Sequence, residues 1–276
     1  MPGSFWKEPF LDMAHKVWAM PEEYWIDDSP RFTDTDLLQT NALSESPIDE
    51  VNFRADMVAK WKAGDAGVKI KIKELPGRTR VVFLGTEEQW SQIPWATWAR
   101  IFQLVEHPIG HVLFYADPRI REDPAEGSPT QKEINGGYSY ICSQELVVIY
   151  RFEEATRVLL HELLHTLCFD SEKGVEHLEA HTEAWTELFL CALLSKGSST
   201  KFNKLWRQQV HWMVEQAKSL SVESEVNTPA DYAWRYMKGK MELLEGMGFL
   251  RGYTAGTAQP TTSLRFTTPE WDNEMQ

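Results

Sequence analysis

Hydrophobic patterns of two kinds follow one another along this chain, and their order limits the folds that it can adopt. Every segment with the pattern of a β-strand ends at or before residue 151, and every periodic segment after it has helical spacing. Strand patterns occur in VKIKIKE, which alternates strictly, and in apolar runs at 78–86, 110–117, 136–143 and 145–151. A sheet followed by helices is typical of an α+β fold, so we expect a mixed sheet of about five strands and then a mainly helical C-terminal half.

The same patterns divide the chain into three parts. These are an acidic, irregular N-terminal segment, a domain that holds the sheet and the helices, and a flexible tail, at residues 1–66, 67–250 and 251–276. Within the domain, the sheet is expected at 67–150 and the helices within 152–246. One helix is predicted in the N-terminal segment, in SPIDEVNFRADMVAKWKAG, where Ser46 would cap the helix and Pro47 would occupy its first turn.

Composition excludes several classes of partner. The net charge is -13 and no cluster of Lys or Arg is present, so neither nucleic acid nor an anionic membrane surface is an expected partner. No apolar run approaches the ~18 to 20 residues of a membrane span, and the first residues lack the order of a signal peptide, which predicts a cytoplasmic protein. Oligomeric state is left open.

The cysteines and tryptophans are expected to pack in the hydrophobic core. Three cysteines and no C-x-x-C motif predict reduced thiols in the core, at Cys142, Cys168 and Cys191. The chain contains 12 tryptophans, and rings such as Trp90, Trp95 and Trp98 are expected to fill core volume near one another.

Residues 161–165 read HELLH within a predicted helix. Residues four apart lie on one face of an α-helix, so His161 and His165 can direct their imidazoles to one point, with Glu162 beside it. Catalytic zinc takes three protein ligands and leaves a fourth position to water, whose proton a neighbouring carboxylate can remove. The motif therefore predicts a zinc site with Glu162 as the general base.

An ordinary amphipathic helix that matches the motif by chance is the alternative. Random order gives on the order of 0.02 such matches in a chain of this composition. Four leucines between residues 160 and 167 would bury one side of the helix, and Glu153 and Glu154 would lie in its first turn, where the helix dipole favours acids. Both features are typical of a buried helix that presents two histidines.

A third zinc ligand must come from another segment. The zinc-protease pattern with a third histidine six residues after the second fails, because Ser171 occupies that position. In the next predicted helix, Glu183 and Glu187 are the only charged residues between 182 and 194. Apolar residues surround them, and buried carboxylates need a partner such as a metal with its histidines. Glu183 is the preferred third ligand and Glu187 the alternative.

HELLH followed by Glu183 resembles the gluzincin zinc metallopeptidases, in which H-E-x-x-H is completed by a glutamate on a second helix. The resemblance implies one Zn²⁺ ion bound by His161, His165 and Glu183, with Glu162 as general base. It also implies that Glu187 hydrogen-bonds a ligand histidine and so fixes its orientation. The implied fold is zincin-like, with the active-site helix between the sheet and the helical half of a catalytic domain at 67–250.

The resemblance covers roughly residues 137–194 and is specific in the first helix and weaker in the second. In the family an edge strand beside the active-site helix binds the peptide backbone, and NGGYSYICS is the candidate for this strand here. The sequence lacks the N-E-x-x-x-A-E motif of longer thermolysin-like enzymes and the G-A-M-E-N signature of aminopeptidases. The HELLH and EAWTE layout is also similar to metallopeptidases of large DNA viruses.

Together these patterns predict a zinc-dependent metallopeptidase that hydrolyses peptide bonds in a peptide or protein substrate. One alternative is a zincin-fold structural or interaction protein that binds zinc without turnover. Another is a metal-dependent hydrolase of a non-peptide amide, which would share the site and differ in the cleft.

Other histidines and tyrosines have weaker signals. His177 and His181 are again four apart, and acidic neighbours favour a solvated polar face there. HPIGH, at 107–111, contains Pro and Gly and is predicted to be a loop. A donor for the oxyanion of a tetrahedral intermediate is left open among three residues of the C-terminal part, His211, Tyr232 and Tyr236.

Overall fold

The structure of the chain is a computed structural model, and it divides into two compact units. The described residues are 5–44, 49, 51–65, 67–127, 129–168, 175–219, 236–253 and 261–275. We call the units the helical unit and the sheet unit; their residues are Met1–Pro21, Glu122–Glu133 and Glu172–Met275 for the first, and Glu22–Arg121 and Ile134–Ser171 for the second. Both units draw on the N-terminal segment 1–66, so the chain divides elsewhere than at the expected boundary.

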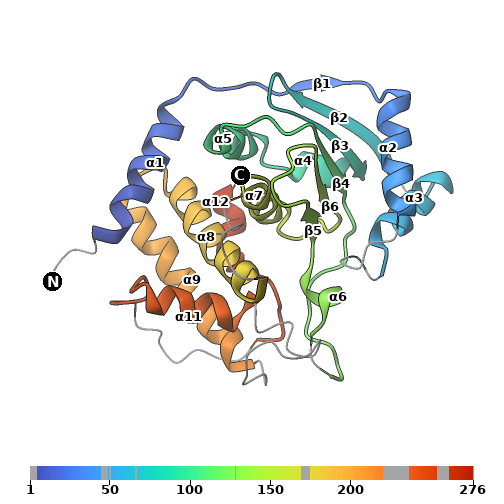
Figure 1. Cartoon of the computed structure of the whole chain (residues 1–276). Coiled ribbons are helices and arrows are strands. Elements are labelled where there is room, and N and C mark those ends of the chain that lie inside the picture. The colour runs from blue at the N-terminus through green and yellow to red at the C-terminus, as the bar shows by residue number, and fades with distance from the viewer. Residues whose placement is uncertain are drawn as a thin grey trace. The chain divides into compact units, whose positions relative to one another are not determined.

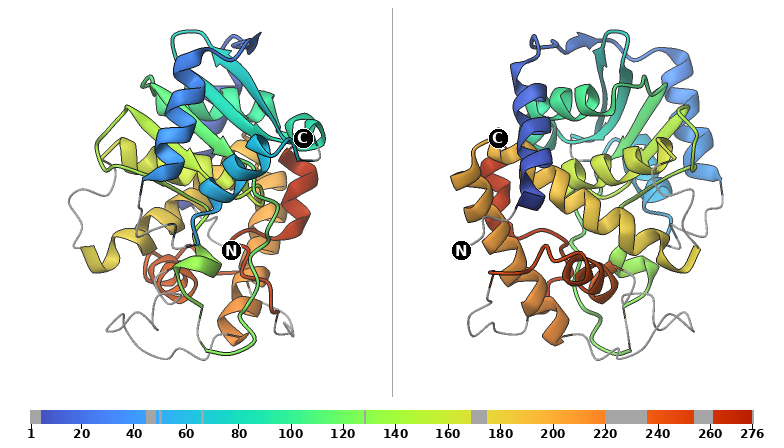
Figure 2. Two further views of the ribbon diagram at one scale, coloured as in Figure 1. Left: turned by 90° about the vertical axis from the view of Figure 1, so that its right-hand side faces the viewer. Right: turned by 60° about the vertical axis from the view of Figure 1, so that its left-hand side comes forward.

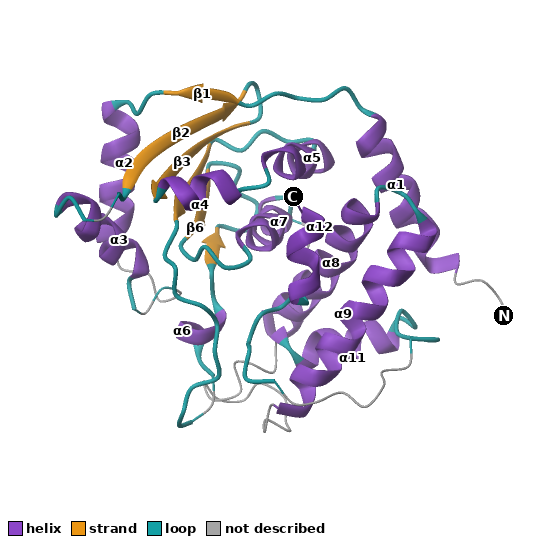
Figure 3. Cartoon of the chain, turned by 180° about the vertical axis from the view of Figure 1, so that it is seen from behind, coloured by secondary structure: helices purple, strands orange, loops and turns teal. Residues whose placement is uncertain are grey.

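The sheet unit is built on six strands (Figures 1 and 3). In their order across the sheet they are β1 (Ile26–Asp28), β2 (Lys69–Leu75), β3 (Thr79–Gly85), β4 (His111–Tyr115), β6 (Leu146–Ile149) and β5 (Gly137–Ser139). Strands β3, β4 and β6 run parallel, and the remaining pairs are antiparallel. The five predicted strands and the mixed sheet are confirmed, and β1 is an addition that its exposed, three-residue sequence did not signal.

Helices cover both faces of this sheet, which explains why β3 and β4 are almost entirely buried. One face packs against α2 (Phe32–Leu43) and α3 (Phe53–Lys62) through a cluster that includes Leu38, Met57, Val82, Leu113 and Val148. The opposite face packs against α5 (Trp95–Val105) and α7 (Ala155–Thr166). Trp98 of α5 stacks on Phe114 of β4 and donates its indole N–H to Thr156 of α7 over 2.9 Å.

The expected tryptophan packing is confirmed in this layer. The ring centroids of Trp90 and Trp95 lie 4.7 Å apart, and those of Trp95 and Trp98 lie 5.4 Å apart. Two short helices complete the described elements between β3 and β5, α4 (Glu87–Gln92) and α6 (Gln131–Ile134).

The N-terminal segment holds three helices where one was predicted. They are α1 (Glu8–Ala19), which follows the short 3-10 helix η1 (Phe5–Lys7), and then α2 and α3. Helix α3 begins at Phe53, and the side chain of Asn52 caps it by accepting the N–H of Ala55 over 3.2 Å. The predicted cap, Ser46 with Pro47, lies outside the described residues.

Helix α8 (Val175–Ser195) is the central helix of the helical unit. Helices α1, α9 (Ser199–Ser219) and α11 (Lys238–Gly246) pack on α8 (Figure 2, where α8 is yellow and α9 orange). An aromatic cluster joins η1, α1 and α8: Trp6 stacks on Phe249 with centroids 4.6 Å apart, and Phe10 stacks on Trp185 at 5.7 Å.

The four helices predicted after residue 151 are present, as α7, α8, α9 and α11.

The expectation of a flexible tail is wrong for residues 261–275. This segment contains the 3-10 helix η3 (Pro269–Trp271) and α12 (Asp272–Met275), and it buries Leu264, Phe266 and Trp271. Three isolated apolar side chains produce no periodicity, so the sequence offered no signal for their burial. No helix among the described residues is both long and apolar enough to cross a membrane.

Candidate metal centre

Helix α7, which carries the HELLH motif, begins at Ala155 after a left-handed residue, Glu154 (φ 59°). Glu153 and Glu154 therefore precede the first turn, and the expectation that they lie within it is wrong. Both bind Arg121 instead. The Glu153 carboxylate accepts the backbone N–H of Arg121 over 2.7 Å, and Glu154 Oε2 lies 3.3 Å from Arg121 Nη1.

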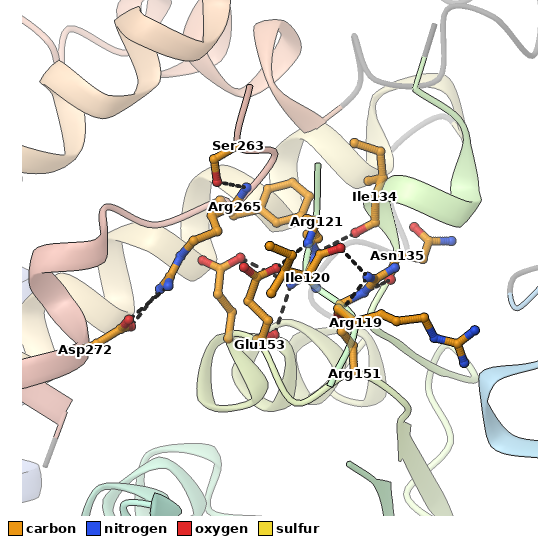
Figure 4. Close-up of polar contacts among 12 residues, drawn as sticks. Arg119, Ile120, Arg121, Ile134, Asn135, Arg151, Glu153, Ser263, Arg265 and Asp272 are labelled. Atoms are coloured by element: carbon orange, nitrogen blue, oxygen red, sulfur yellow. Dashed lines mark hydrogen bonds and ion pairs between the residues drawn. The ribbon is translucent and has the colours of Figure 1, made fainter. Parts of the chain in front are cut away.

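Two buried arginines hold the chain where α7 and β5 begin (Figure 4). Arg121 donates from Nε to the carbonyl of Ile134 over 2.8 Å. Arg151 donates from Nη1 to the carbonyls of Arg119 and Ile120, each over 3.0 Å. Burial and the neighbouring Arg121 lower the pKa of Arg151 to about 10, which still leaves it charged at neutral pH. Sequence patterns do not reveal these contacts, because both arginines bind main-chain carbonyls.

Every residue of α7 from Ala155 to Thr166 is buried. Leu160, Leu163 and Leu164 are among them, as the leucine stripe predicted, while Leu167 is half-buried. The three polar residues of the motif are buried as well, with exposed fractions of 6% for His161, 5% for Glu162 and 6% for His165. A helix that is buried all round is more constrained than the one-sided amphipathic helix that was expected.

The two histidines of α7 point to one place. Their Nε2 atoms lie 3.0 Å apart, within the same buried helix. Two imidazole nitrogens that bind one tetrahedral zinc ion at 2.0 to 2.1 Å lie about 3.3 Å apart. The observed separation is close to that value, so the pair fits a metal that takes nitrogen ligands.

Glu162 is directed toward β5 rather than toward solvent. The hydroxyl of Ser139 lies 2.9 Å from Oε2 of Glu162 and 3.0 Å from its main-chain oxygen. Gly137, also on β5, allows the strand to approach α7 closely, because a Cβ there would lie 2.6 Å from Val158 Cγ1 and 2.6 Å from the Val148 carbonyl oxygen. The contact with Ser139 was not predicted, and serine in an edge strand offers no signal for it.

The end of α7 is tied to the turn after β5 by a disulfide between Cys142 and Cys168. The backbone N–H groups of both cysteines donate to the carbonyl of His165, over 3.0 and 3.1 Å. The expectation of reduced core thiols is therefore wrong for this pair, whose residues are exposed and 26 positions apart. Cys191 is a buried thiol as expected, and burial raises its pKa.

The candidate carboxylates of the second helix lie on α8, in the helical unit. Glu183 and Glu187 are both buried, as predicted for a helix that is apolar on both sides. Glu187 has partners that were not predicted: its Oε1 pairs with the buried Lys240 of α11, and its Oε2 accepts from Gln209 Nε2 of α9 over 2.8 Å. These contacts account for the burial of Glu187 without a metal ion.

The other histidines noted in the sequence lie on different elements and differ in exposure. His107 lies in the predicted loop, while His111 is the first residue of β4. His181 is half-buried on α8, and the side chain of His177 lies outside the described residues.

The three candidates for an oxyanion donor also differ in their contacts and burial. His211 lies 3.4 Å from Glu215 on the partly exposed face of α9. Tyr236 is buried, with its ring centroid 5.6 Å from that of Phe266. Tyr232 lies outside the described residues.

Comparison with known proteins adds no relative. No family model matches this chain, and no curated protein or solved structure does either. The resemblance to gluzincins stays a prediction.

Proposed function

We propose that this chain is a zinc-dependent metallopeptidase with a zincin-like fold and a gluzincin-type ligand set. The observation that carries the proposal is the pair of buried imidazoles on α7, whose Nε2 atoms lie 3.0 Å apart with Glu162 next in the helix. Neutral imidazole nitrogens are preferred zinc ligands, and a purely structural site has no use for an adjacent general base. This combination favours a hydrolase over a zinc-binding protein without turnover.

A zinc ion held by His161 and His165 would supply a Lewis acid for a water molecule and for a substrate carbonyl. The proton transfers of the reaction are carried out by a residue of the chain. Glu162 removes the proton of the attacking water and delivers it to the leaving amine. Its burial keeps bulk water from competing for the carboxylate, which strengthens the electrostatic interactions made there.

The substrate is proposed to bind along β5. This strand ends the order of the sheet, so its outer edge can pair with an extended peptide backbone. It also packs directly against α7, and its Ser139 touches the proposed general base. A peptide added to this edge would place a scissile bond beside α7, which favours a peptide over a non-peptide amide as the substrate.

The third ligand is proposed to come from α8. Glu183 is the prediction from the sequence, and it is buried as a ligand carboxylate would be. Glu179, one turn earlier on the same helix, is a second candidate, because it also offers a carboxylate ligand. The pairing of Glu187 with Lys240 and Gln209 favours both of these over Glu187.

Two measurements on the same proteins test the proposal. Elemental analysis should find close to one zinc ion per chain in the wild type and a large loss in His161→Ala, while His211→Ala serves as the control. Hydrolysis of fluorescently labelled, unfolded casein should be present in the wild type and lost in Glu162→Gln, which should keep its zinc. Full activity in Glu162→Gln would refute the mechanism, and zinc without any hydrolysis in the wild type would favour the binding protein.

A further inference from the structure

We propose that Ser139 is a positioning residue that holds the carboxylate of Glu162 for its role as general base. The inference rests on the proposed function and deepens it, because it assigns a residue outside the H-E-x-x-H motif to the same reaction. No residue of β5 belongs to the motif or to the predicted ligands on α8. The contact between β5 and the general base is a property of the tertiary structure.

The geometry of the serine hydroxyl suits this role. Ser139 Oγ lies 2.9 Å from Glu162 Oε2 and 3.0 Å from the main-chain oxygen of the same residue. A hydroxyl has one hydrogen to donate, and a bond to an ionised carboxylate is the stronger of the two available to it. The main-chain oxygen provides a second acceptor at nearly the same distance. The carboxylate is therefore the preferred acceptor of the Ser139 hydrogen.

The orientation of Ser139 is set from the opposite side of the strand. Successive side chains of a β-strand point to opposite faces, so Tyr138 points away from the face that carries Ser139. The Tyr138 hydroxyl binds Arg54 Nη1 over 2.8 Å and Asn41 Nδ2 over 2.9 Å. Arg54 is fully buried and pairs with Asp49 over 2.8 Å, which anchors this side. The anchored tyrosine prevents β5 from rotating, and this keeps Ser139 toward α7.

Close packing of β5 on α7 fixes the distance as well as the direction. Ser139 pairs with Val147 of β6, and Gly137 pairs with Ile149, so both ends of β5 are in register with a buried strand. At Gly137 even a methyl group would clash with Val158 of α7 and with the carbonyl of Val148. The strand therefore has little freedom to move relative to Glu162. A carboxylate held in this way needs no reorganisation before proton transfer.

The first arm of the test compares activity in variants that differ by single groups. Ser139→Ala should keep its zinc content and its KM, while kcat should fall about 10-fold to 100-fold, because a misplaced catalytic group costs rate rather than binding. Ser139→Thr keeps a hydroxyl and should recover most of the loss. Ser91→Ala is the matched control, since that hydroxyl is exposed on α4 and donates to the main-chain oxygen of Glu88 over 2.7 Å.

The second arm does not depend on catalysis. In the metal-free protein, the ¹³C chemical shift of the Glu162 carboxyl carbon, assigned with Glu162→Gln, should change in Ser139→Ala and return in Ser139→Thr. Thermal unfolding of each variant shows that the fold is intact. The wild-type value in Ser139→Ala would mean that the serine does not hold the carboxylate.

The outcomes separate the two proposals. A wild type that hydrolyses casein, with Ser139→Ala at full kcat, would overturn the positioning role and leave the peptidase proposal standing. Equal losses in Ser139→Ala and Ser139→Thr would also overturn it, because the hydroxyl would then be irrelevant. A wild type without hydrolysis would refute the peptidase, and the carboxyl shift alone would then decide whether Ser139 holds Glu162.

Discussion

Lys240 and Glu187 form an ion pair inside the helical unit, and both side chains are fully buried, with exposed fractions of 0%. Removing one member of such a pair leaves a buried charge without its partner. We expect Lys240→Met to destabilise the fold by about 3 to 5 kcal/mol, and the double variant Lys240→Met with Glu187→Met to lose less than this single change. Urea unfolding of the three proteins measures both. A single variant as stable as the wild type would contradict the prediction.

The proposed third zinc ligand can be identified by comparing three glutamates of α8. Glu183→Ala should weaken zinc binding by at least about 10-fold, because a buried ligand is lost and water replaces it poorly. Glu187→Ala should weaken it less, since Glu187 is engaged by Lys240 and Gln209. Competition with a chromophoric chelator reports both affinities. The largest loss in Glu179→Ala would assign the site to Glu179 instead.

Acid should weaken the sheet unit through two aspartates that bind Arg80. The hydrogen bond from Arg80 lowers the pKa of Asp28 from 3.8 to about 2. Burial alone would raise the pKa of Asp34, but the hydrogen bonds and charge of Arg80 outweigh it and lower the value. Carboxyl groups with lowered pKa values stabilise the fold above pH 3.8, and this contribution is lost as the pH falls toward about 2.

Urea midpoints measured from pH 5 to pH 2.5 check this expectation. Arg80→Met should be less stable at pH 5 and should lose less further stability on acidification than the wild type. Lys16→Met is the control, because its ion pair with Asp12 is exposed on both sides. Parallel profiles for the wild type and Arg80→Met would show that these aspartates do not govern acid stability.

The disulfide between Cys142 and Cys168 should add measurably to stability. It closes a loop with a sequence separation of 26 residues, for which loss of chain entropy in the unfolded state corresponds to about 3.5 kcal/mol. Dithiothreitol should therefore lower the urea midpoint of the wild type. The variant with Cys142→Ala and Cys168→Ala should start at the lower value and respond no further to the reductant. A wild type insensitive to complete reduction would contradict this account.

Prediction from sequence succeeded where the signal is local. The alternation of VKIKIKE and the buried runs of β3, β4 and β6 reflect the faces that each strand presents, so the five strands were found. Helix α1 was missed even though Phe10, Leu11, Ala14 and Val17 have helical spacing and are buried. Its acidic, aromatic-rich surroundings concealed a signal that was present.

The motif in α7 was also a local signal, because helical spacing places its two imidazoles on one face, where their Nε2 atoms lie 3.0 Å apart. The partners of the site residues were not local. The sequence indicated that Glu187 needs a partner, but it offered no means of choosing Lys240 over a metal-bound histidine. The Cys142 and Cys168 pair escaped for the same reason, because its geometry exists only after β5 and α7 have packed.

Periodicity depends on neighbours a few residues away, so local patterns in the chain set the order of strands and helices and place His161, Glu162 and His165 on one helix. The contacts between distant groups depend instead on how the elements pack. Ser139 and Glu162 are 23 residues apart, and Glu187 and Lys240 are 53 apart. Such pairs form when whole elements pack, since the direction of each side chain is then set by the strand or helix that carries it.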